Sequence, residues 1–514
     1  MSNNGSEGPK IEVFAVHGVE PEVQAYAMAK YSRSALSMKE SLKQISEQKA
    51  EQFLNTFYFQ YGHRSIADLA HIALAIEKLS ILAAIAVVDE QRWDGQERST
   101  RYQDFKKSGY HVPDFADAAA DKLYRETVDF LFAEYEAFSG DMFRYLAERT
   151  PRPDEMKQAD YDRTLRARAF DLSRYLLPLA TNTSLGQIVN ARTLESQISR
   201  LLSHTHPEVR YLGELLKQAA REPAYSVGAE AARQLVEDIR KADPALGERA
   251  ALLLLKETKA APTLVKYAEP NPYEIETRPE LRQCASDLMK DIPPAATKAV
   301  ELCDYDPFEV ELAATLLYPH CHHSYRQISS MVDSLPEPRR REIIEVGTRH
   351  RGKHDELPRE FAGGQRLRFD ILMDIGGFRD MHRHRRCVQI MQGFTTQHAF
   401  DTPEDIVEAG QDLRYQKAMQ RAAEVCAQLS SAKGGDAEAI AQYVIPLGYR
   451  KRTLFKMDFA EAVYISELRT GVAGHFSYRK VAWQMYEAVA RRYPALAKYF
   501  RVTDVREPVD LLKR

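Results

Sequence analysis

Cysteine is scarce in this sequence, with five residues among 514 and no C-x-x-C pair. Disulfide-stabilised secreted domains usually carry an even number of cysteines at regular spacings. This set is odd in number and scattered, so we expect a reducing, intracellular compartment. The cysteines are Cys284, Cys303, Cys321, Cys387 and Cys426.

Long apolar runs are also missing. The longest, Ile81–Val88, is far shorter than the roughly 20 residues of a membrane-spanning helix. The N-terminal MSNNGSEGPK has no apolar segment of the kind found in secretory signal peptides. We therefore expect a cytoplasmic protein that begins with a disordered tail over residues 1–9.

Neither sign of charge dominates, because 71 basic residues face 74 acidic ones and the net charge is −3. The overall charge therefore does not attract nucleic acid or an anionic membrane, and any anion must be bound by a local cluster. A glycine-rich phosphate loop of the Rossmann or P-loop type is also absent from any strand–turn–helix context.

The length predicts two to four domains. Hydrophobic patterning predicts a helix from Pro21 past Tyr31, a strand over His71–Glu77 and an apolar helix over Ser80–Val88. Further helices are expected over Asp121–Arg149 and Leu194–Leu202, and the segment Leu212–Lys259 is expected to be helical. Six prolines between Ala261 and Val300 indicate an irregular connector.

After this connector the pattern of the chain begins again. Pro178 precedes Arg200-x5-His206-x3-Arg210, and Pro446 precedes Arg469-x5-His475-x3-Arg479. Two related domains are the better interpretation, because the period is too long for a solenoid. We place a first half at residues 10–225, a helical and proline-rich connector at 226–295, and a second half at 296–514.

The most basic motif, Arg383-His384-Arg385, lies in the second half. An apolar strand is expected over Phe369–Ile375, broken by Gly376-Gly377, with a helix from Phe378 onward. On that helix Arg379, Arg383 and Arg386 would share one face. Such a face either lies opposite an anion, for which the arginine fork is suited, or is solvated.

These motifs resemble the flavin-dependent thymidylate synthases, whose signature is Arg-His-Arg, seven residues and then Ser, usually continued as Ser-x-Arg-Tyr. The first half has every element except the Arg-His-Arg, which Asp89-Glu90-Gln91 replaces. The elements present are Gly62-His63-Arg64-Ser65, Ser99-Thr100-Arg101-Tyr102, Arg174 before Leu177-Pro178, Asn190-Ala191-Arg192, and Arg200.

The second half keeps Arg383-His384-Arg385 and Arg469, and His354 is a loose match to the family's flavin histidine. The other motif positions have changed. Gly393 replaces the serine, Thr395 the phosphate-binding arginine, Gln442 the arginine before Leu-Pro, and Asp458 and Ala460 the Asn-x-Arg pair. The losses in the two halves are thus complementary.

The resemblance implies an α+β fold: two related domains, helix-rich, each with a small antiparallel or mixed sheet. It also implies methylation of dUMP to dTMP, with FAD as cofactor, NADPH as reductant and methylenetetrahydrofolate as carbon donor. Family members are homotetramers with sites shared between subunits. We therefore expect a homodimer that mimics that tetramer, with composite sites built from both halves.

The resemblance also assigns roles to residues of this chain, and no metal ligands are among them. Catalytic roles fall to Arg469, Arg200 and Ser99, with the alternative between the two arginines left open. Substrate binding falls to Ser99, Arg101, Arg174 and Arg383. Contact with the flavin cofactor falls to His63, Ser65, Arg383, His384, Arg385, Asn190 and Arg192.

Two alternatives stay open. The first is a non-catalytic relative that binds flavin or a nucleotide. The second is a nucleic-acid-binding protein using Arg339-Arg340-Arg341, although neighbouring acidic residues favour a mixed-charge helix surface there. His320-Cys321-His322-His323 resembles a metal cluster, but adjacent residues seldom all reach one ion, so we expect no metal.

Overall fold

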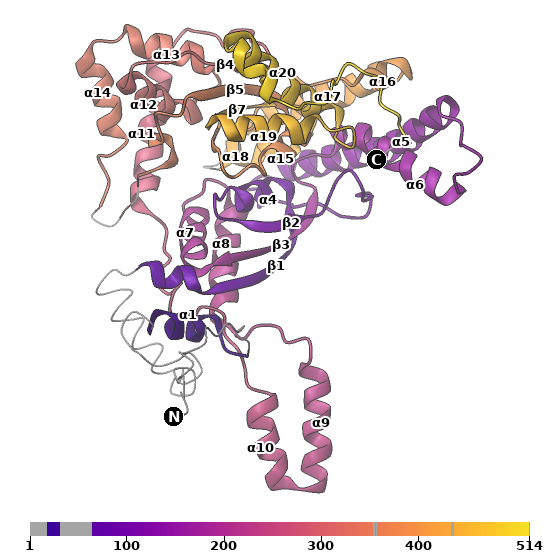
Figure 1. Ribbon diagram of the computed structural model, residues 1–514, viewed down its shortest axis with the longest axis vertical. Coiled ribbons are helices and arrows are strands. Elements are labelled where there is room, and N and C mark those ends of the chain that lie inside the picture. The colour runs from indigo at the N-terminus through magenta and orange to yellow at the C-terminus, as the bar shows by residue number, and fades with distance from the viewer. Residues whose placement is uncertain (1–17, 31–63, 353–354, 356, 433–435, 513–514) are drawn as a thin grey trace, which may run out of the picture. The chain divides into compact units, whose positions relative to one another are not determined.

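The computed structural model describes residues 18–30, 64–352, 355, 357–432 and 436–512 (Figure 1). Two compact units are present. Unit 1 is formed by Met1–Leu74, Ile188–Ile198 and Leu215–Ala268, and unit 2 by Ala75–Gln187, Ser199–Glu214 and Glu269–Arg514. In the described residues, no helix is both long and apolar enough to cross a membrane.

The first half contains a three-stranded sheet of order β1-β3-β2, and the division between the units falls within β1 and β3. Its elements are α1 (Pro21–Lys30), η2 (Arg64–Leu69), β1 (His71–Ser80), α4 (Ile81–Val88), β2 (Asp94–Glu97), α5 (Ala118–Arg149), α6 (Gln158–Ser173), η3 (Arg174–Leu176), β3 (Asn182–Asn190), α7 (Ala191–Leu202) and α8 (Pro207–Arg221). The helices and strand predicted here are confirmed, except that the helix beyond Tyr31 lies outside the described residues.

The second half contains a four-stranded antiparallel sheet of order β4-β5-β7-β6. Its elements are β4 (Val300–Leu302), α12 (Phe308–Leu317), η4 (Tyr318–His320), α13 (Tyr325–Ser334), α14 (Glu337–Val346), η5 (Arg359–Phe361), β5 (Leu367–Asp374), α15 (Ile375–Met381), β6 (Val388–Met391), α16 (Glu404–Glu408), α17 (Asp412–Ser430), α18 (Ala437–Ala441), η6 (Gln442–Val444), β7 (Arg450–Met457), α19 (Phe459–Thr470), α20 (Phe476–Arg492) and η7 (Pro494–Tyr499).

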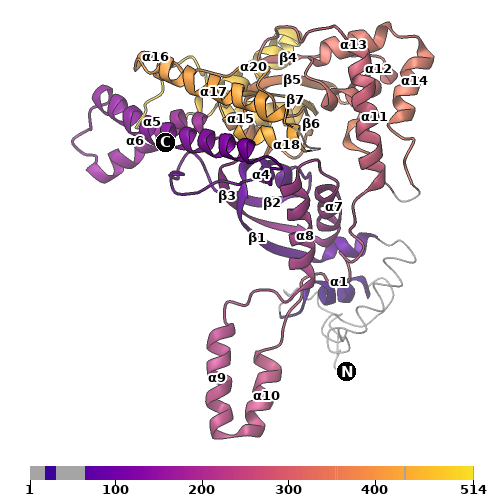
Figure 2. The same ribbon diagram turned by 180° about the vertical axis from the view of Figure 1, so that it is seen from behind.

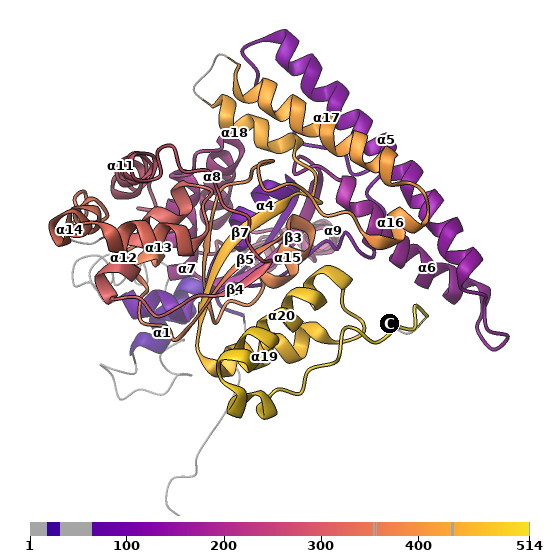
Figure 3. The same cartoon turned by 90° about the horizontal axis from the view of Figure 1, so that it is seen from above.

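The two halves repeat one topology. The series β1-α4-β2, then η3-β3-α7-α8, returns as β5-α15-β6, then η6-β7-α19-α20, and the strand order β1-β3-β2 returns as β5-β7-β6. A helix-rich α+β fold with two small sheets is therefore confirmed. In unit 2 the long helices α5 and α17 lie side by side, joined by Arg414 to Glu134 and Asp141 (Figure 3).

Matched positions of the two halves pair with each other inside unit 2. The N–H of Leu179 donates to the carbonyl of Ile445 at 2.9 Å, and the N–H of Leu447 donates to the carbonyl of Leu177 at 2.9 Å. Pro178 and Pro446 face each other in an antiparallel bridge between these bonds. Reciprocal contacts of this kind define an isologous interface, which here is made within one chain.

The helix α15 begins earlier and ends earlier than the sequence predicts. Asp374 caps it by accepting the N–H of Gly377, so the Gly376-Gly377 pair lies in the first turn and does not break the helix. A Cβ on Gly377 would stand 2.8 Å from the Ser477 hydroxyl, which explains glycine there. The helix ends at Met381, so the prediction that Arg379, Arg383 and Arg386 share a helical face is wrong.

The connector is more ordered than its prolines suggest. Helices α9 (Ala229–Ala242) and α10 (Pro244–Leu254) form an antiparallel hairpin in unit 1 (Figure 2). In unit 2, α11 (Pro272–Leu288) contains Pro279 and buries Leu281 and Ala285 in apolar clusters of the second half. The prediction of an irregular segment is wrong for α11, because burial of one helix face outweighs the interior proline.

Candidate functional site

The Arg383-His384-Arg385 motif occupies the turn between α15 and β6. The N–H of His384 donates to the Met381 carbonyl at 3.1 Å, and the Gln389 amide donates to the His384 carbonyl at 2.8 Å. These bonds fix the turn and bury the His384 ring, which is 5% exposed. Arg383 and Arg385, on either side, stay half-buried.

A continuous chain of contacts joins this turn to the Ser-x-Arg motif of the first half. The Ser99 hydroxyl accepts the backbone N–H of Arg101 at 3.2 Å, and Arg101 Nη1 donates to the Tyr478 hydroxyl at 3.0 Å. The Arg469 guanidinium carbon lies 5.4 Å from the centre of the Tyr478 ring. Arg469 Nε in turn donates to His384 Nε2 at 2.8 Å. All five residues belong to unit 2.

The hydrogen bond to Arg469 also sets the tautomer of His384. Because Nε2 accepts, the proton of the neutral ring is on Nδ1, which faces Glu461 Oε1 at 3.7 Å. Burial lowers the pKa of His384, against the opposing effect of Glu461, so the ring is neutral at pH 7. The arginine therefore keeps its charge beside an uncharged imidazole.

Arg101 is held by a carboxylate. Its Nε and Nη2 donate to the two oxygens of Asp171 at 2.7 and 3.1 Å, in a buried bidentate pair. Burial alone would raise the pKa of Asp171, but His475, Arg101 and Arg174 outweigh it and lower the pKa to about 2. An anionic ligand must therefore compete with Asp171 for Arg101.

Two further arginines converge on Thr100 from opposite halves. Arg174 Nη1 and Arg379 Nη1 lie 3.5 and 3.4 Å from the Thr100 hydroxyl. Arg174 is 1% exposed, and its Nε and Nη2 have no hydrogen-bond partner; the Nε of Arg379 has none either. Asp380 lies 3.9 Å from Arg174, and Glu97 pairs with Arg379. Buried donors without acceptors are uncommon and favour a missing acceptor.

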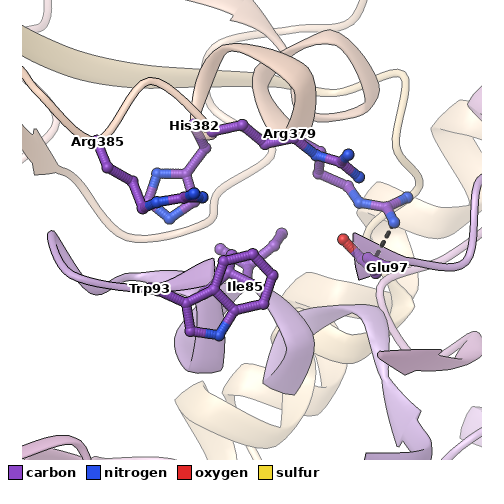
Figure 4. Close-up of a pocket in the computed structure, with 8 residues that line it drawn as sticks. Ile85, Trp93, Glu97, Arg379, His382 and Arg385 are labelled. Carbon is purple, nitrogen blue, oxygen red and sulfur yellow. Dashed lines mark hydrogen bonds and ion pairs between the residues drawn. The ribbon is translucent and has the colours of Figure 1, made fainter. Parts of the chain in front are cut away.

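A solvent-open hollow lies beside this cluster, between α4 and β2 on one side and α15 with its following turn on the other (Figure 4). The first half lines it with Ile85 and Trp93. The second half lines it with arginines and with His382, whose ring is 4% exposed. The first-half wall is therefore mostly apolar apart from Glu97, and the second-half wall is rich in arginine.

Arg200, the counterpart of Arg469, occupies a different environment. It pairs with Glu90, with its Nη2 2.8 Å and its Nε 2.9 Å from Oε1, and donates to the carbonyl of Ala86 at 2.9 Å. Glu90 stands at the first-half position that corresponds to His384. The contact between matched positions is thus retained, but an ion pair has replaced the arginine–imidazole bond.

The remaining predicted residues lie in unit 1 or outside the described residues. Asn190 Oδ1 accepts the N–H of Thr193 at 2.8 Å, which caps the start of α7, and Arg192 pairs with Asp68 at 3.4 Å. Ser65 is exposed on η2. His63 and His354 lie outside the described residues.

Sequence reasoning missed Tyr478, Asp171 and Trp93. The spacing of Tyr478, three residues after His475, offered a weak signal, because it places both side chains at the start of one helix. The basic run 339–341 is a mixed-charge helix surface, with Arg339 paired to Glu342 and Arg341 to Glu337.

Residues 16–224 and 309–495 match the family model described as thymidylate synthase complementing protein. The chain belongs to this family. Its matched regions correspond to the two halves of repeated topology, and the resemblance to the flavin-dependent thymidylate synthases is confirmed at the level of the family.

Relatives that align along most of the chain include two UPF0159 proteins. That of Chlamydia muridarum is 27% identical over 96% of this chain and 92% of its own length, and that of Chlamydia pneumoniae is 28% identical over 97% and 93%. A flavin-dependent thymidylate synthase of Clostridium tetani is 25% identical over 34% of this chain and 67% of its own length.

Solved structures with local likeness include a UMP/dUMP methylase, PolB of Streptomyces cacaoi bound with 5-Br dUMP, at 14% identity. It covers 39% of this chain and 85% of that chain with a TM-score of 0.27. The flavin-dependent thymidylate synthase ThyX of Helicobacter pylori, complexed with FAD and dUMP, is 16% identical over 41% and 93%, with a TM-score of 0.24.

Proposed function

We propose that this chain methylates dUMP to dTMP, using FAD, NADPH and methylenetetrahydrofolate, at a composite site built from both halves. The folate donates a methylene group to C5 of dUMP, and C5 loses its proton. Bound FAD would supply the two-electron hydride chemistry that reduces the methylene to methyl, with NADPH as the reductant and tetrahydrofolate as the leaving group.

The observation that supports this proposal is the contact chain from Ser99 to His384. The two halves lost different motif elements, and the elements that survive in each half meet through Tyr478. Independent decay of two copies gives no reason for the surviving residues to converge on one place.

The phosphate of dUMP fits the cluster around Thr100. Ser99 uses its oxygen to accept the Arg101 N–H, so its own hydrogen remains available to a phosphate oxygen. Arg174 offers two buried guanidinium nitrogens without partners. A phosphate dianion satisfies such donors with charge-assisted hydrogen bonds.

The pyrimidine needs a cation where negative charge develops during attack by C5. Arg469 is suited to this role because its hydrogen-bond partner His384 is neutral and leaves the charge unpaired. Arg200 is neutralised by Glu90, so we assign the pyrimidine to Arg469. Arg383, His384 and Arg385 are assigned to FAD.

Release of tritium from C5-labelled dUMP tests the proposal. Arg383→Ala and Arg101→Ala should each reduce turnover at least a hundredfold, because each removes a charge from a different half. Arg163→Ala, an exposed arginine on α6, is the matched control and should leave turnover unchanged. Turnover like wild type in either site variant would count against a composite site.

A second candidate is a non-catalytic member that binds the flavin or nucleotide without turnover. It is favoured by the carboxylates that already neutralise Arg101 and Arg200. Rescue of a thymidine-requiring bacterial strain separates the two, because a binding protein that is yellow with flavin still fails to support growth.

A further inference from the structure

The α9–α10 hairpin of unit 1 is a single layer of two antiparallel helices (Figure 1). The helices pack closely at Gly247, where a Cβ would stand 2.6 Å from the Cα of Arg240. Of the residues in these two helices, Val236 and Gly247 are buried. Two helices alone bury little apolar surface, and a core forms only when a second layer covers the first.

The leucines of the hairpin gather on one side of this layer. Successive helical residues are about 100° apart, so Leu235 and Leu246 each lie about a quarter turn from the buried Val236 and Gly247. Because the two helices are antiparallel, both quarter turns lead to the same side. Leu253, seven residues after Leu246, lies on that side as well. Leu235, Leu246 and Leu253 are 52%, 47% and 81% exposed.

The opposite side of the hairpin is charged. Arg240 pairs there with Glu237 and with Glu248, whose Oε1 lies 3.1 Å from the arginine Nε. Between Ala229 and Leu254 the chain has five acidic and four basic residues, so the hairpin is almost neutral. This balance attracts neither nucleic acid nor an anionic membrane. Exposed leucines opposite a charged side therefore indicate a protein partner with an apolar face.

The charges that border the leucines are complementary to each other. Asp238 on α9 and Arg249 on α10 flank the leucine side, five and six residues from Asp243 at the turn. Asp238 contacts Lys241 and Gln234 through Oδ1, and Arg249 forms no hydrogen bond or ion pair within the described part of the chain. A second hairpin turned by 180° about an axis parallel to the helices would place Asp238 opposite the partner's Arg249, and the reverse.

The leucine side is large enough for a specific interface. α9 has 14 residues, so it is about 21 Å long, and two adjacent helices about 20 Å wide give a face of roughly 400 Å² in projection. Side chains make the accessible surface larger than its projection, so two such faces would bury about 1,200 Å², near the lower limit for specific dimers. The hairpin lies outside residues 16–224 and 309–495, which match the family model.

We propose that the α9–α10 hairpins of two copies of this chain pack leucine side to leucine side and form an antiparallel four-helix bundle. The inference does not rest on the proposed function. Leucine and alanine fill the core of the bundle, and Asp238 pairs with the partner's Arg249 along its edges. A second copy is the partner that fits, because a self-complementary surface pairs with itself about a two-fold axis.

Sedimentation velocity of the full chain tests the bundle, and wild type should sediment as a dimer at micromolar concentrations. Leu235→Glu with Leu253→Glu should weaken self-association at least a hundredfold, because it places four carboxylates in the bundle core. Leu413→Glu on α17, at a residue that is 69% exposed, is the matched control and should leave self-association unchanged. Emission from Trp93 and Trp483, both in unit 2, should be the same in every variant and serves as the control for folding.

An exchange of charges tests the arrangement of the two hairpins. Arg249→Asp should weaken the dimer about tenfold, because two like charges would then face each other at both edges. Asp238→Arg added to this variant should restore the affinity, since each edge regains opposite charges.

A wild-type chain that stays monomeric at every concentration overturns the inference. A leucine variant that dimerises as tightly as wild type does so as well, because another surface would then join the copies. Failure of the second charge exchange to restore the affinity overturns the pairing of Asp238 with the partner's Arg249. None of these measurements depends on dUMP turnover, so they leave the proposed function untouched.

Discussion

In the folded protein, Arg101 forms an ion pair with a carboxylate. Its bidentate partner Asp171 and the Tyr478 hydroxyl occupy three of its donors, and all three side chains are buried. In this state the guanidinium is oriented but neutralised. A phosphate must therefore replace Asp171 or bind beside the pair, on Arg174.

Because Arg101 and Asp171 form a buried ion pair, we expect the loss of one partner to destabilise the protein more than the loss of both. Asp171→Asn leaves Arg101 buried without a counter-ion and should lower the free energy of unfolding by about 3 kcal/mol. The double variant Asp171→Asn with Arg101→Met removes the unpaired charge and should recover much of that loss. Urea denaturation of Asp171→Asn, of Arg101→Met and of the double variant completes a double-mutant cycle, and additive losses would show that the two side chains are not coupled.

A pH dependence follows from two carboxylates, Asp89 and Asp171, whose pKa values are lowered in the folded protein. Burial would raise the pKa of Asp89, but Arg359, His382 and Arg200 outweigh it and lower the pKa to about 2, as for Asp171. A depressed folded-state pKa contributes stability above the unfolded value near 4 that is lost as pH falls toward 2. Each group should contribute about 2 kcal/mol at pH 7.

Denaturation from pH 6 to pH 3 measures this dependence. The free energy of unfolding should fall as acid is added, and Asp89→Asn should flatten the curve between pH 5 and 3. A variant that loses stability in parallel with wild type over this range would contradict the assignment.

At the scale of elements, the two halves meet through segments that leave little room for side chains. Gly448, in the paired segment after Pro446, donates its N–H to the Tyr175 carbonyl at 3.0 Å. A Cβ at this position would lie 2.5 Å from the Tyr415 hydroxyl oxygen and 3.2 Å from the Cβ of Tyr175. The close approach of η3 to this loop therefore requires glycine.

Gly448→Ala should destabilise the protein by about 1–3 kcal/mol, because the added methyl group overpacks this junction. Gly140→Ala is the matched control. Its Cβ would meet nothing closer than 3.7 Å on α5, and replacing a helical glycine should stabilise by about 0.5–1 kcal/mol. Thermal unfolding compares the two, and a shift of the same sign in both would contradict this account of the junction.

The sequence predicts elements where one local pattern decides the structure. The helix α4 was predictable because Ser80 caps an apolar run that is buried on every side. The extent of α15 was not, since glycine usually breaks a helix and the contact with Ser477 that requires it comes from about a hundred residues later. Pro279 led to the wrong prediction of an irregular segment for the same reason, because tertiary burial decides the structure of α11.

Prediction of the candidate site from the sequence is limited in the same way, because local patterns do not encode long-range contacts. Motif order identified Ser99, Arg101, His384 and Arg469, which the structure brings together in one unit. It did not identify Tyr478, which joins them, because 377 residues separate Tyr478 from Arg101. A contact between residues so distant is not encoded in local spacing, and the position of Tyr478 three residues after His475 is only a weak signal for it.

At the scale of the whole molecule, the repeated topology and the proposed function together predict one working site per chain. At the matched second position, Gln442 stands for Arg174, Thr395 for Arg101 and Glu90 for His384. The first two replacements remove positive charges that a nucleotide phosphate needs, and the third puts a carboxylate in place of a neutral imidazole. The proposed homodimer would then carry two sites where a family tetramer carries four.

Calorimetry with dUMP should therefore give one nucleotide per chain. Arg174→Ala should abolish binding, while Gln442→Ala, the matched substitution in the other half, should leave both affinity and stoichiometry unchanged. Two nucleotides per chain would contradict the assignment of a single site, whatever the oligomeric state.

The caps of the matched helices show what joining the copies made possible. Ser80 donates its hydroxyl to Glu208 at 2.6 Å, whereas at the matched place Ser477 donates to Asp374, so acid and alcohol have changed places. In an assembly of identical subunits, a mutation in the single gene changes the same position in every subunit. An exchange of the acid and the alcohol would then disrupt the cap in both subunits at once. When the two copies lie in one chain, each is encoded separately. One half can therefore change at such a position while the other half keeps its hydrogen bond and its fold.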